Sequence, residues 1–203
     1  MLHRRSPALA IMLTVIIPTH NSERALVPTL AMLIPGAMSG TVRDVIVADA
    51  GSADATARVV DVAGCDIMVS GAPLAARLRS AAAAARGTWL LFLRPGVVLE
   101  PSWVGEAART IEHAVLRGTT ESHAAAFRRA TETDVTLPRQ LIALFAAAWR
   151  GPHPEQGLML SREAYDQLGG HRDGVADPER ELMRRIGRRR IVTLRSAATG
   201  WRW

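Results

Sequence analysis

Short apolar runs alternate with helix-like segments along the first half of the chain. Runs of strand length, rich in branched aliphatic and aromatic residues, lie at Leu13–Pro18, Asp44–Ala48, Asp66–Val69 and Thr88–Leu93. Between them the apolar spacing predicts helices from Ser22 to about Leu33, from about Asp54 to Val62, and from Ala75 to Arg86. This alternation, with short connections, predicts an α/β fold with a doubly wound, mostly parallel sheet covered on both faces.

The second half of the chain is less regular. We expect helices at Ser102–Leu116, Leu137–Trp149, Arg162–Leu168 and Pro178–Ile186, and strands at Ala124–Thr131, Gly157–Leu160 and Ile191–Leu194. Because no repeat or linker interrupts the pattern, we predict a single domain over residues 12–203. Met12 offers an alternative start of translation, so residues 1–11 are predicted to form an arm outside the fold.

The apolar N-terminus resembles a signal peptide, but we expect it to be a core strand. It continues into Pro18-Thr19-His20-Asn21 without a small-residue cleavage site. No apolar stretch approaches the roughly 18 residues that a membrane-spanning helix needs.

Charge and composition narrow the classes of partner. The net charge is +6, and every basic residue other than histidine is arginine, whose guanidinium group suits phosphate oxyanions. Aromatic residues make up only 4% of the chain, too few for base-stacking platforms, so we expect no nucleic acid partner. Cys65 is the only cysteine, which excludes an internal disulfide and fits a reducing, cytoplasmic setting.

Three polar turns follow predicted strands and should meet at one edge of the sheet. They are Thr19–Glu23, Asp49–Asp54 and Arg94–Gly96, and ligands of open parallel sheets bind beyond this edge. The Asp49 carboxylate could accept hydrogen bonds from a base or ribose, Gly51 permits close backbone approach, and the helix after Ser52 offers free N–H groups to a phosphate. The alternative is that Ser52 and Asp54 only cap a helix.

Four segments together resemble the family 2 glycosyltransferases. They are TVIIPTHNSE (Thr14–Glu23), VIVADAGSADAT (Val45–Thr56), AAAARGTWLLFL (Ala82–Leu93) and GLMLSREAYDQLGG (Gly157–Gly170), in the family's order and spacing over nearly the whole chain. The closest pattern is that of the short bacterial subgroup. The resemblance implies a GT-A fold, a nucleotide-diphospho-sugar donor, and a role in cell-envelope or polysaccharide synthesis.

The resemblance also implies which residues bind the donor. Besides Asp49, Gly51, Ser52 and Asp54, the matching positions are Pro18, Thr19, Asn21 and Glu23 in the first turn, and Arg77 and Arg79 facing the diphosphate. A cap and turn explain Asn21 and Ser22 equally well.

The turn after the fourth strand departs from the family. Members normally carry Asp-x-Asp or a single acidic variant there, which binds Mg²⁺ or Mn²⁺ and bridges it to substrate phosphates. This chain has Arg94-Pro95-Gly96, without a side-chain oxygen, so we predict no metal site of the usual kind. One hypothesis is that Arg94 stabilises the diphosphate leaving group itself. The alternative is a solvated arginine in an inactive site.

The acceptor side keeps more acidic residues. Glu155-Gln156 matches the subgroup's Gly-Asp-Gln, and Pro178-Glu179-Arg180-Glu181-Leu182 matches the family's Glu-Asp-x-Glu-Leu. The resemblance implies that Glu179 is the general base, with Asp177 as a rival. The alternative is that these acids only favour a helix N-terminus electrostatically. His153 and His171 are isolated and are expected to be structural or on the surface.

The resemblance therefore implies inverting transfer of a sugar to the hydroxyl of an unknown glycan or lipid-linked acceptor. The competing prediction is a catalytically inactive module that binds a nucleotide or a partner protein. A peripheral contact with the inner face of the membrane is a further hypothesis, resting on Leu137–Trp149 with Arg139 and Arg150, and on the basic tail with Trp201 and Trp203.

Overall fold

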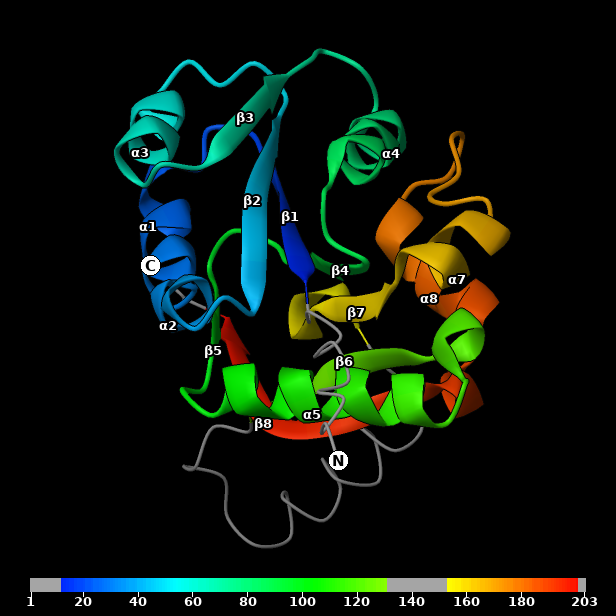
Figure 1. The fold of residues 1–203 in the computed structure, drawn as a ribbon. Coiled ribbons are helices and arrows are strands. Elements are labelled where there is room, and N and C mark those ends of the chain that lie inside the picture. Colours follow the sequence, from blue (N-terminus) through cyan, green and yellow to red (C-terminus); the bar gives the residue numbers. More distant parts are fainter. Residues whose placement is uncertain (1–11, 131–152, 201–203) are drawn as a thin grey trace, which may run out of the picture.

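A computed structural model describes residues 12–130 and 153–200 (Figure 1). Its centre is one eight-stranded sheet of order β3-β2-β1-β4-β7-β6-β8-β5. The strands are β1 (Leu13–Thr19), β2 (Val42–Asp49), β3 (Asp66–Val69), β4 (Trp89–Phe92), β5 (Val97–Leu99), β6 (Ala124–Arg129), β7 (Leu158–Ser161) and β8 (Ile191–Gly200). The predicted helix at Leu137–Trp149 and the predicted membrane contacts, including Trp201 and Trp203, lie outside the described residues.

The first four strands form the parallel half of the sheet. β1 pairs in parallel with β2 on one side and β4 on the other, and β2 pairs in parallel with β3. Thr19 lies opposite Asp49, and Ile16 opposite Phe92. The three polar turns therefore leave the sheet at one edge, as the strand pattern predicted.

The other half of the sheet is mixed. β7 is antiparallel to β4 and β6, and β5 is antiparallel to β8, whereas β6 and β8 are parallel. Parallel pairs thus remain the majority. Two apolar cores cover the two faces because alternate residues of β1 point in opposite directions: Val15 belongs to one core and Ile16 to the other.

The helices divide between these two faces. α1 (Glu23–Ala31), α2 (Ile34–Met38) and α3 (Thr56–Val62) lie together beside β1–β3, and α4 (Leu74–Ala84) lies apart from them near α7 (Arg162–Gln167) and α8 (Pro178–Ile186) (Figure 1). α5 (Trp103–Leu116) runs along β6 and β8 (Figure 1). Within the described part of the chain, none of the helices combines the length and apolar character needed to cross a bilayer.

Two details differ from the sequence prediction. The helix predicted from Ser22 to about Leu33 is α1, which ends at Ala31, and the separate short helix α2, which begins at Ile34, was not predicted. The strand β5 was not predicted at all. It has three residues, and its hydrogen-bonding partner β8 lies about a hundred positions further along the chain. No local sequence pattern therefore predicts it.

Gly87 fixes the approach of the chain to the N-terminal end of β1. Its N–H donates to Thr14 Oγ1 over 2.8 Å. A Cβ atom at this position would lie 2.6 Å from both the Met12 carbonyl oxygen and the Thr14 nitrogen. Those are backbone atoms of the central strand, so they cannot move aside as a flexible side chain could.

We expect Gly87→Ala to lower the free energy of unfolding by about 2–3 kcal/mol, at the upper end of the cost of overpacking. Urea unfolding would measure this. Gly71→Ala is the matched control, because nothing lies within 4 Å of its Cβ position. Equal unfolding free energies for the two variants would contradict the proposed steric role.

Candidate functional site

Two loops at the edge of the sheet are held together by reciprocal hydrogen bonds. We call residues 19–23 and 49–56 the paired loops. The Asn21 N–H donates to Ser52 Oγ over 2.8 Å, and Asn21 Oδ1 accepts from the Ala53 N–H over 2.8 Å. The Glu23 N–H donates to Asp54 Oδ2 over 3.1 Å. Asn21 has φ +48°, a left-handed conformation that asparagine tolerates well. Each loop therefore sets the shape of the other.

The Asp49 carboxylate is the centre of the paired loops. Oδ1 accepts from Thr19 Oγ1 at 2.6 Å and Ser52 Oγ at 2.5 Å, and Oδ2 accepts from the N–H groups of Gly51 at 2.9 Å and Ser52 at 2.7 Å. Asp49 is only 2% exposed. Burial acts to raise the pKa of its carboxyl, but the four hydrogen bonds outweigh it and lower the pKa below the ordinary value. Asp49 thus holds the loops, and its predicted contact with a nucleotide stays a prediction.

The two arginines expected beside the diphosphate both have protein partners. Arg77 donates to the carbonyl oxygens of Thr19, Ala48 and Ala72, behind the paired loops. Arg79 donates to the His171 carbonyl oxygen over 2.6 Å and to Asp173 over 2.5 Å. In this arrangement both guanidinium groups are engaged by the protein itself. Pro18, the remaining predicted contact in the first turn, is buried in β1 opposite Ala48.

The Arg94-Pro95-Gly96 segment forms a tight turn that fixes the backbone of Arg94. The Val97 N–H donates to the Arg94 carbonyl over 3.1 Å, and Gly96 has φ +87°. Proline followed by a left-handed glycine is typical of a type II turn. The Gly96 N–H is within hydrogen-bonding distance of both the Ala25 carbonyl and Thr29 Oγ1, at 2.9 Å each, which attaches the turn to α1.

From this turn the Arg94 side chain reaches both candidate bases. Its Nε donates to Glu179 Oε2 over 2.6 Å, and its Nη2 lies 3.2 Å from Asp177 Oδ1 and 3.3 Å from Oδ2. Asp177 is the N-cap of α8 and also accepts from the Arg180 N–H over 3.0 Å. We call Arg94, Asp177 and Glu179 the ion cluster. The sequence indicated these three residues separately and gave no signal that they touch.

The three side chains of the ion cluster differ in how far they are exposed to solvent. The Glu179 side chain is 5% exposed, against 35% for Asp177 and 31% for Arg94. Burial raises the pKa of Glu179, and the adjacent guanidinium only partly offsets this. Glu179 Oε2 binds Arg94. Oε1 accepts no hydrogen bond from the described residues, and this atom keeps some exposure to solvent.

The donor set of the site does not suit a divalent metal of the usual kind. Among residues 12–130 and 153–200, no group of three or more histidine, cysteine or acidic side chains is placed to hold one. The two carboxylates of the ion cluster are already bridged by the Arg94 guanidinium. Hard cations need several converging oxygen ligands, and here the Arg94 guanidinium lies between the two carboxylates instead.

The predicted acceptor-side pair has one structural and one exposed member. Gln156 Nε2 donates to the Phe127 carbonyl over 2.7 Å, and its Oε1 accepts from the His153 N–H over 2.7 Å, so it links β6 to the turn before β7. Glu155 is exposed, and its Oε2 lies 3.5 Å from Arg129. Only Glu155 is placed to meet a ligand from solution.

A buried aromatic pair beneath the site was missed. His171, expected to be structural or on the surface, is 1% exposed, and its Nδ1 lies 2.8 Å from the Tyr165 hydroxyl. Burial lowers the pKa of His171 to about 3 and raises that of Tyr165 to about 12, so both stay neutral. Both rings pack on Phe92. The only sequence signal is the position of His171 directly after Gly169-Gly170.

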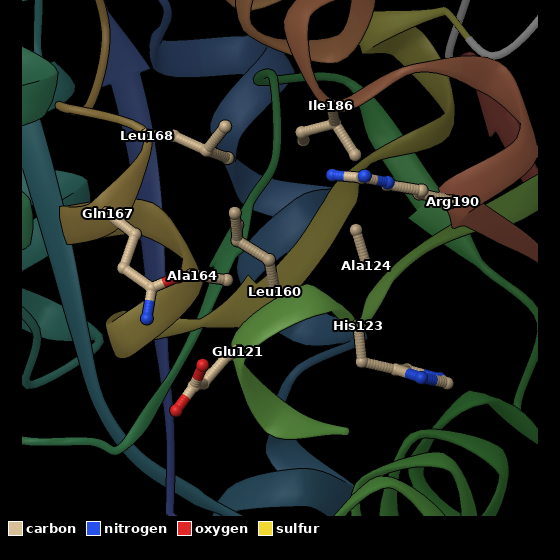
Figure 2. A pocket seen from close by; sticks show the side chains of 9 residues that line it. All are labelled: Glu121, His123, Ala124, Leu160, Ala164, Gln167, Leu168, Ile186 and Arg190. Carbon is tan, nitrogen blue, oxygen red and sulfur yellow. The ribbon is translucent and has the colours of Figure 1, made fainter.

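A small cavity lies among α7, α8, β6 and β7 (Figure 2). It measures about 170 Å³ and has Ala124, Leu160 and Ile186 in its apolar wall, with His123 and Arg190 beside them. Leu160 is near the end of β7 remote from the three polar turns. Ligand pockets usually enclose roughly 300–1,000 Å³, so this cavity is too small for a nucleotide-sugar.

Comparison with known proteins places this geometry in context. The family model described as glycosyl transferase family 2 matches residues 14–169. No curated protein gives a significant match.

Solved structures share the fold at low sequence identity. Glucosyl-3-phosphoglycerate synthase from Mycobacterium tuberculosis, with Mn²⁺, UDP and glucosyl-3-phosphoglycerate, is 15% identical with a TM-score of 0.58, over 95% of this chain and 72% of that one. S. aureus TarS with UDP-GlcNAc is 18% identical with a TM-score of 0.66, over 94% and 59%. The Pyrobaculum calidifontis mannosyltransferase with GDP-Man and Mn²⁺ is 16% identical with a TM-score of 0.66, over 92% and 56%. The sheet and its helices are thus those of the GT-A fold, and the chain spans little more than half of the last two proteins.

The central place of Asp49 in the paired loops is testable. Asp49→Asn presents an amide to donors that now meet a carboxylate, so we expect a loss of about 1–3 kcal/mol in the free energy of unfolding at neutral pH. Because folding lowers this pKa below 3.8, the stabilisation is present above that value and is lost as the pH falls through the folded pKa. The difference between the two proteins should therefore shrink on acidification.

Chemical denaturation across a pH series would measure the effect. Asp61→Asn, which changes an exposed acid on α3, is the matched control. A pH-independent difference, or none, would rule out the charge of Asp49 as the source.

Proposed function

The chain belongs to glycosyl transferase family 2, and from that membership we propose that it transfers a sugar from a nucleotide-diphospho-sugar to an acceptor hydroxyl, with inversion and without a bound metal. The ion cluster is the observation that carries the proposal. It brings a cation and two carboxylates together, at the edge of the sheet where the paired loops lie.

Donor binding is proposed for the edge of the sheet between the paired loops and Arg94. The loops are held in shape by Asp49, Ser52 and Asn21 before any ligand arrives, which reduces the entropy lost on binding. Arg94 uses Nε and Nη2 within the ion cluster, and its Nη1 donates to none of the described residues. The two N–H groups of Nη1 would bind a diphosphate oxygen and stabilise the leaving group.

Glu179 is the proposed general base. Arg94 fixes one of its oxygens, and the other would take the proton of the acceptor hydroxyl as that hydroxyl attacks the anomeric carbon. The bond to the diphosphate breaks on the opposite face, which inverts the configuration. A pKa raised by burial makes Glu179 a stronger base than a solvated glutamate. Asp177 would hold the guanidinium in place from its other side.

The charge of the ion cluster favours a second candidate function. With both carboxylates ionised, one guanidinium leaves the cluster at a net charge of −1, which opposes the approach of a diphosphate. A protein with this site could bind a nucleotide or a partner without turnover. Release of free nucleoside diphosphate from a sugar donor, with water as acceptor, distinguishes the two functions without knowledge of the true acceptor.

Calorimetric titration with UDP, GDP, dTDP and their common sugars, with and without Mn²⁺, tests the donor site. We expect one nucleotide to bind without metal, and Arg94→Ala to weaken that binding by about 10- to 100-fold through loss of a charge-assisted hydrogen bond. Arg128→Ala, which removes an exposed arginine paired with Glu100, is the control. Binding that requires Mn²⁺ would overturn metal independence, and no binding at all would overturn the donor site.

The acid limb of the pH–rate profile tests the general base. Because the Glu179 pKa is raised above its ordinary 4.5, kcat/KM should fall as the pH falls through a value higher than 4.5. Glu179→Gln should lose that limb and about 10²- to 10⁴-fold of the rate. Glu179→Asp should retain the limb at reduced rate. If Glu179→Gln keeps both rate and limb while Asp177→Asn loses them, Asp177 is the base.

A further inference from the structure

An open apolar groove lies along α1, α2 and α3, beside β2. Its volume is about 790 Å³, several times that of the cavity in Figure 2. Val42 and Val45 of β2 contribute to it, with Leu30 and Val59 from the helices. The groove lies between the three helices: α1 and α3 meet at Glu23 and Ala55, and α2 packs on β2.

Large apolar side chains are exposed around this groove. Val27 is 52% exposed, Ile34 is 55% exposed and Val62 is 81% exposed, and all three line it. Met38, one helical turn after Ile34, is 84% exposed. The other exposed large apolar residues of the described chain are spread over β3, α5, β8 and the loop before α8. A concentrated apolar patch of this kind on a protein surface indicates an interaction site.

Cations without partners accompany the apolar side chains. Arg43 and Arg58 line the groove, both are exposed, and neither forms an ion pair within the described residues. The lining also holds two acids: Asp44 is buried and paired with Arg86, and Glu23 is exposed, with its carboxylate accepting from the Ala55 N–H over 3.4 Å. The groove therefore combines apolar walls with two arginines that form no ion pair within the described residues.

We propose that the groove is the surface by which the protein docks on an anionic lipid bilayer. Val27, Ile34 and Val62 would enter the boundary between headgroups and acyl chains, and Arg43 and Arg58 would bind lipid phosphates. This combination of exposed aliphatic groups with flanking arginines is how peripheral proteins gain both hydrophobic and electrostatic binding energy. A bilayer satisfies both features together, whereas a protein partner would need acidic groups placed to match each arginine.

Docking on this surface would place the bilayer beside the paired loops. Glu23 and Ala55 line one end of the groove and also belong to the paired loops. The proposal does not depend on the proposed transferase activity, and its test has no activity readout. It also moves the predicted membrane contact from residues outside the described structure to α1, α2 and α3.

The test is co-sedimentation of the whole protein with vesicles. One set contains phosphatidylcholine alone, and the other contains about 30 mol % phosphatidylglycerol, whose charge should recruit the arginines. We expect binding to the anionic vesicles and its release by high salt, which screens the headgroups. Ile34→Ser/Val62→Ser and Arg43→Ser/Arg58→Ser should each lower the partition coefficient by about tenfold or more.

The matched control is Leu116→Ser/Arg117→Ser, which removes an equally exposed apolar residue and an exposed arginine at the end of α5. It should bind like the parent protein. Circular dichroism melting of each variant separates misfolding from lost docking.

Three outcomes would overturn the proposal. They are no sedimentation with anionic vesicles, equal binding to uncharged ones, and loss of binding in the α5 control as large as in the groove variants. Light scattering tests whether a second copy of the protein occupies the groove instead of a bilayer. A dimer of the parent protein that Ile34→Ser/Val62→Ser dissociates would assign the groove to a second copy instead.

Discussion

The hydrogen bonds of the Asp49 carboxylate are the interaction on which the paired loops depend. Two of its bonds reach side chains, and two reach the backbone of the loop that follows β2. Through Thr19 it joins the ends of β1 and β2, and through Ser52 it positions the hydroxyl oxygen that accepts from the Asn21 N–H. An ionised carboxylate is the one common side chain that can accept four such bonds, which explains an acid in a place that is almost sealed from water.

The ion cluster solves a different electrostatic problem. A glutamate as buried as Glu179 would lose much of its tendency to ionise without a neighbouring cation. In relatives that use a metal, a divalent ion can provide such a charge. Here a guanidinium provides it from a turn fixed by Pro95 and Gly96, with a rigid fork of donors in place of a coordination sphere.

Much of the fold could be predicted from the sequence, and less of the site. Strands such as β1 and β4 and helices such as α4 are specified by local apolar patterns, and parallel pairing then dictates that their polar turns share an edge. The strand β5 and the contact of Arg94 with Glu179 depend on residues about a hundred and 85 positions apart, respectively, to which no local pattern refers. For the same reason, the engagement of Arg77 and Arg79 with carbonyl groups was not foreseen.

The bridge between Arg94 and its two acids also bears on how such a site can evolve. Replacing the arginine by an acid without a metal at hand would leave three carboxylates facing one another, one of them buried. Neutralising the acids first would leave the Arg94 guanidinium without either of its ion-pair partners. The cationic turn and the acidic helix start are therefore epistatic: a lineage can pass between this arrangement and a metal-dependent one only by changes that keep the local charge compensated at every step.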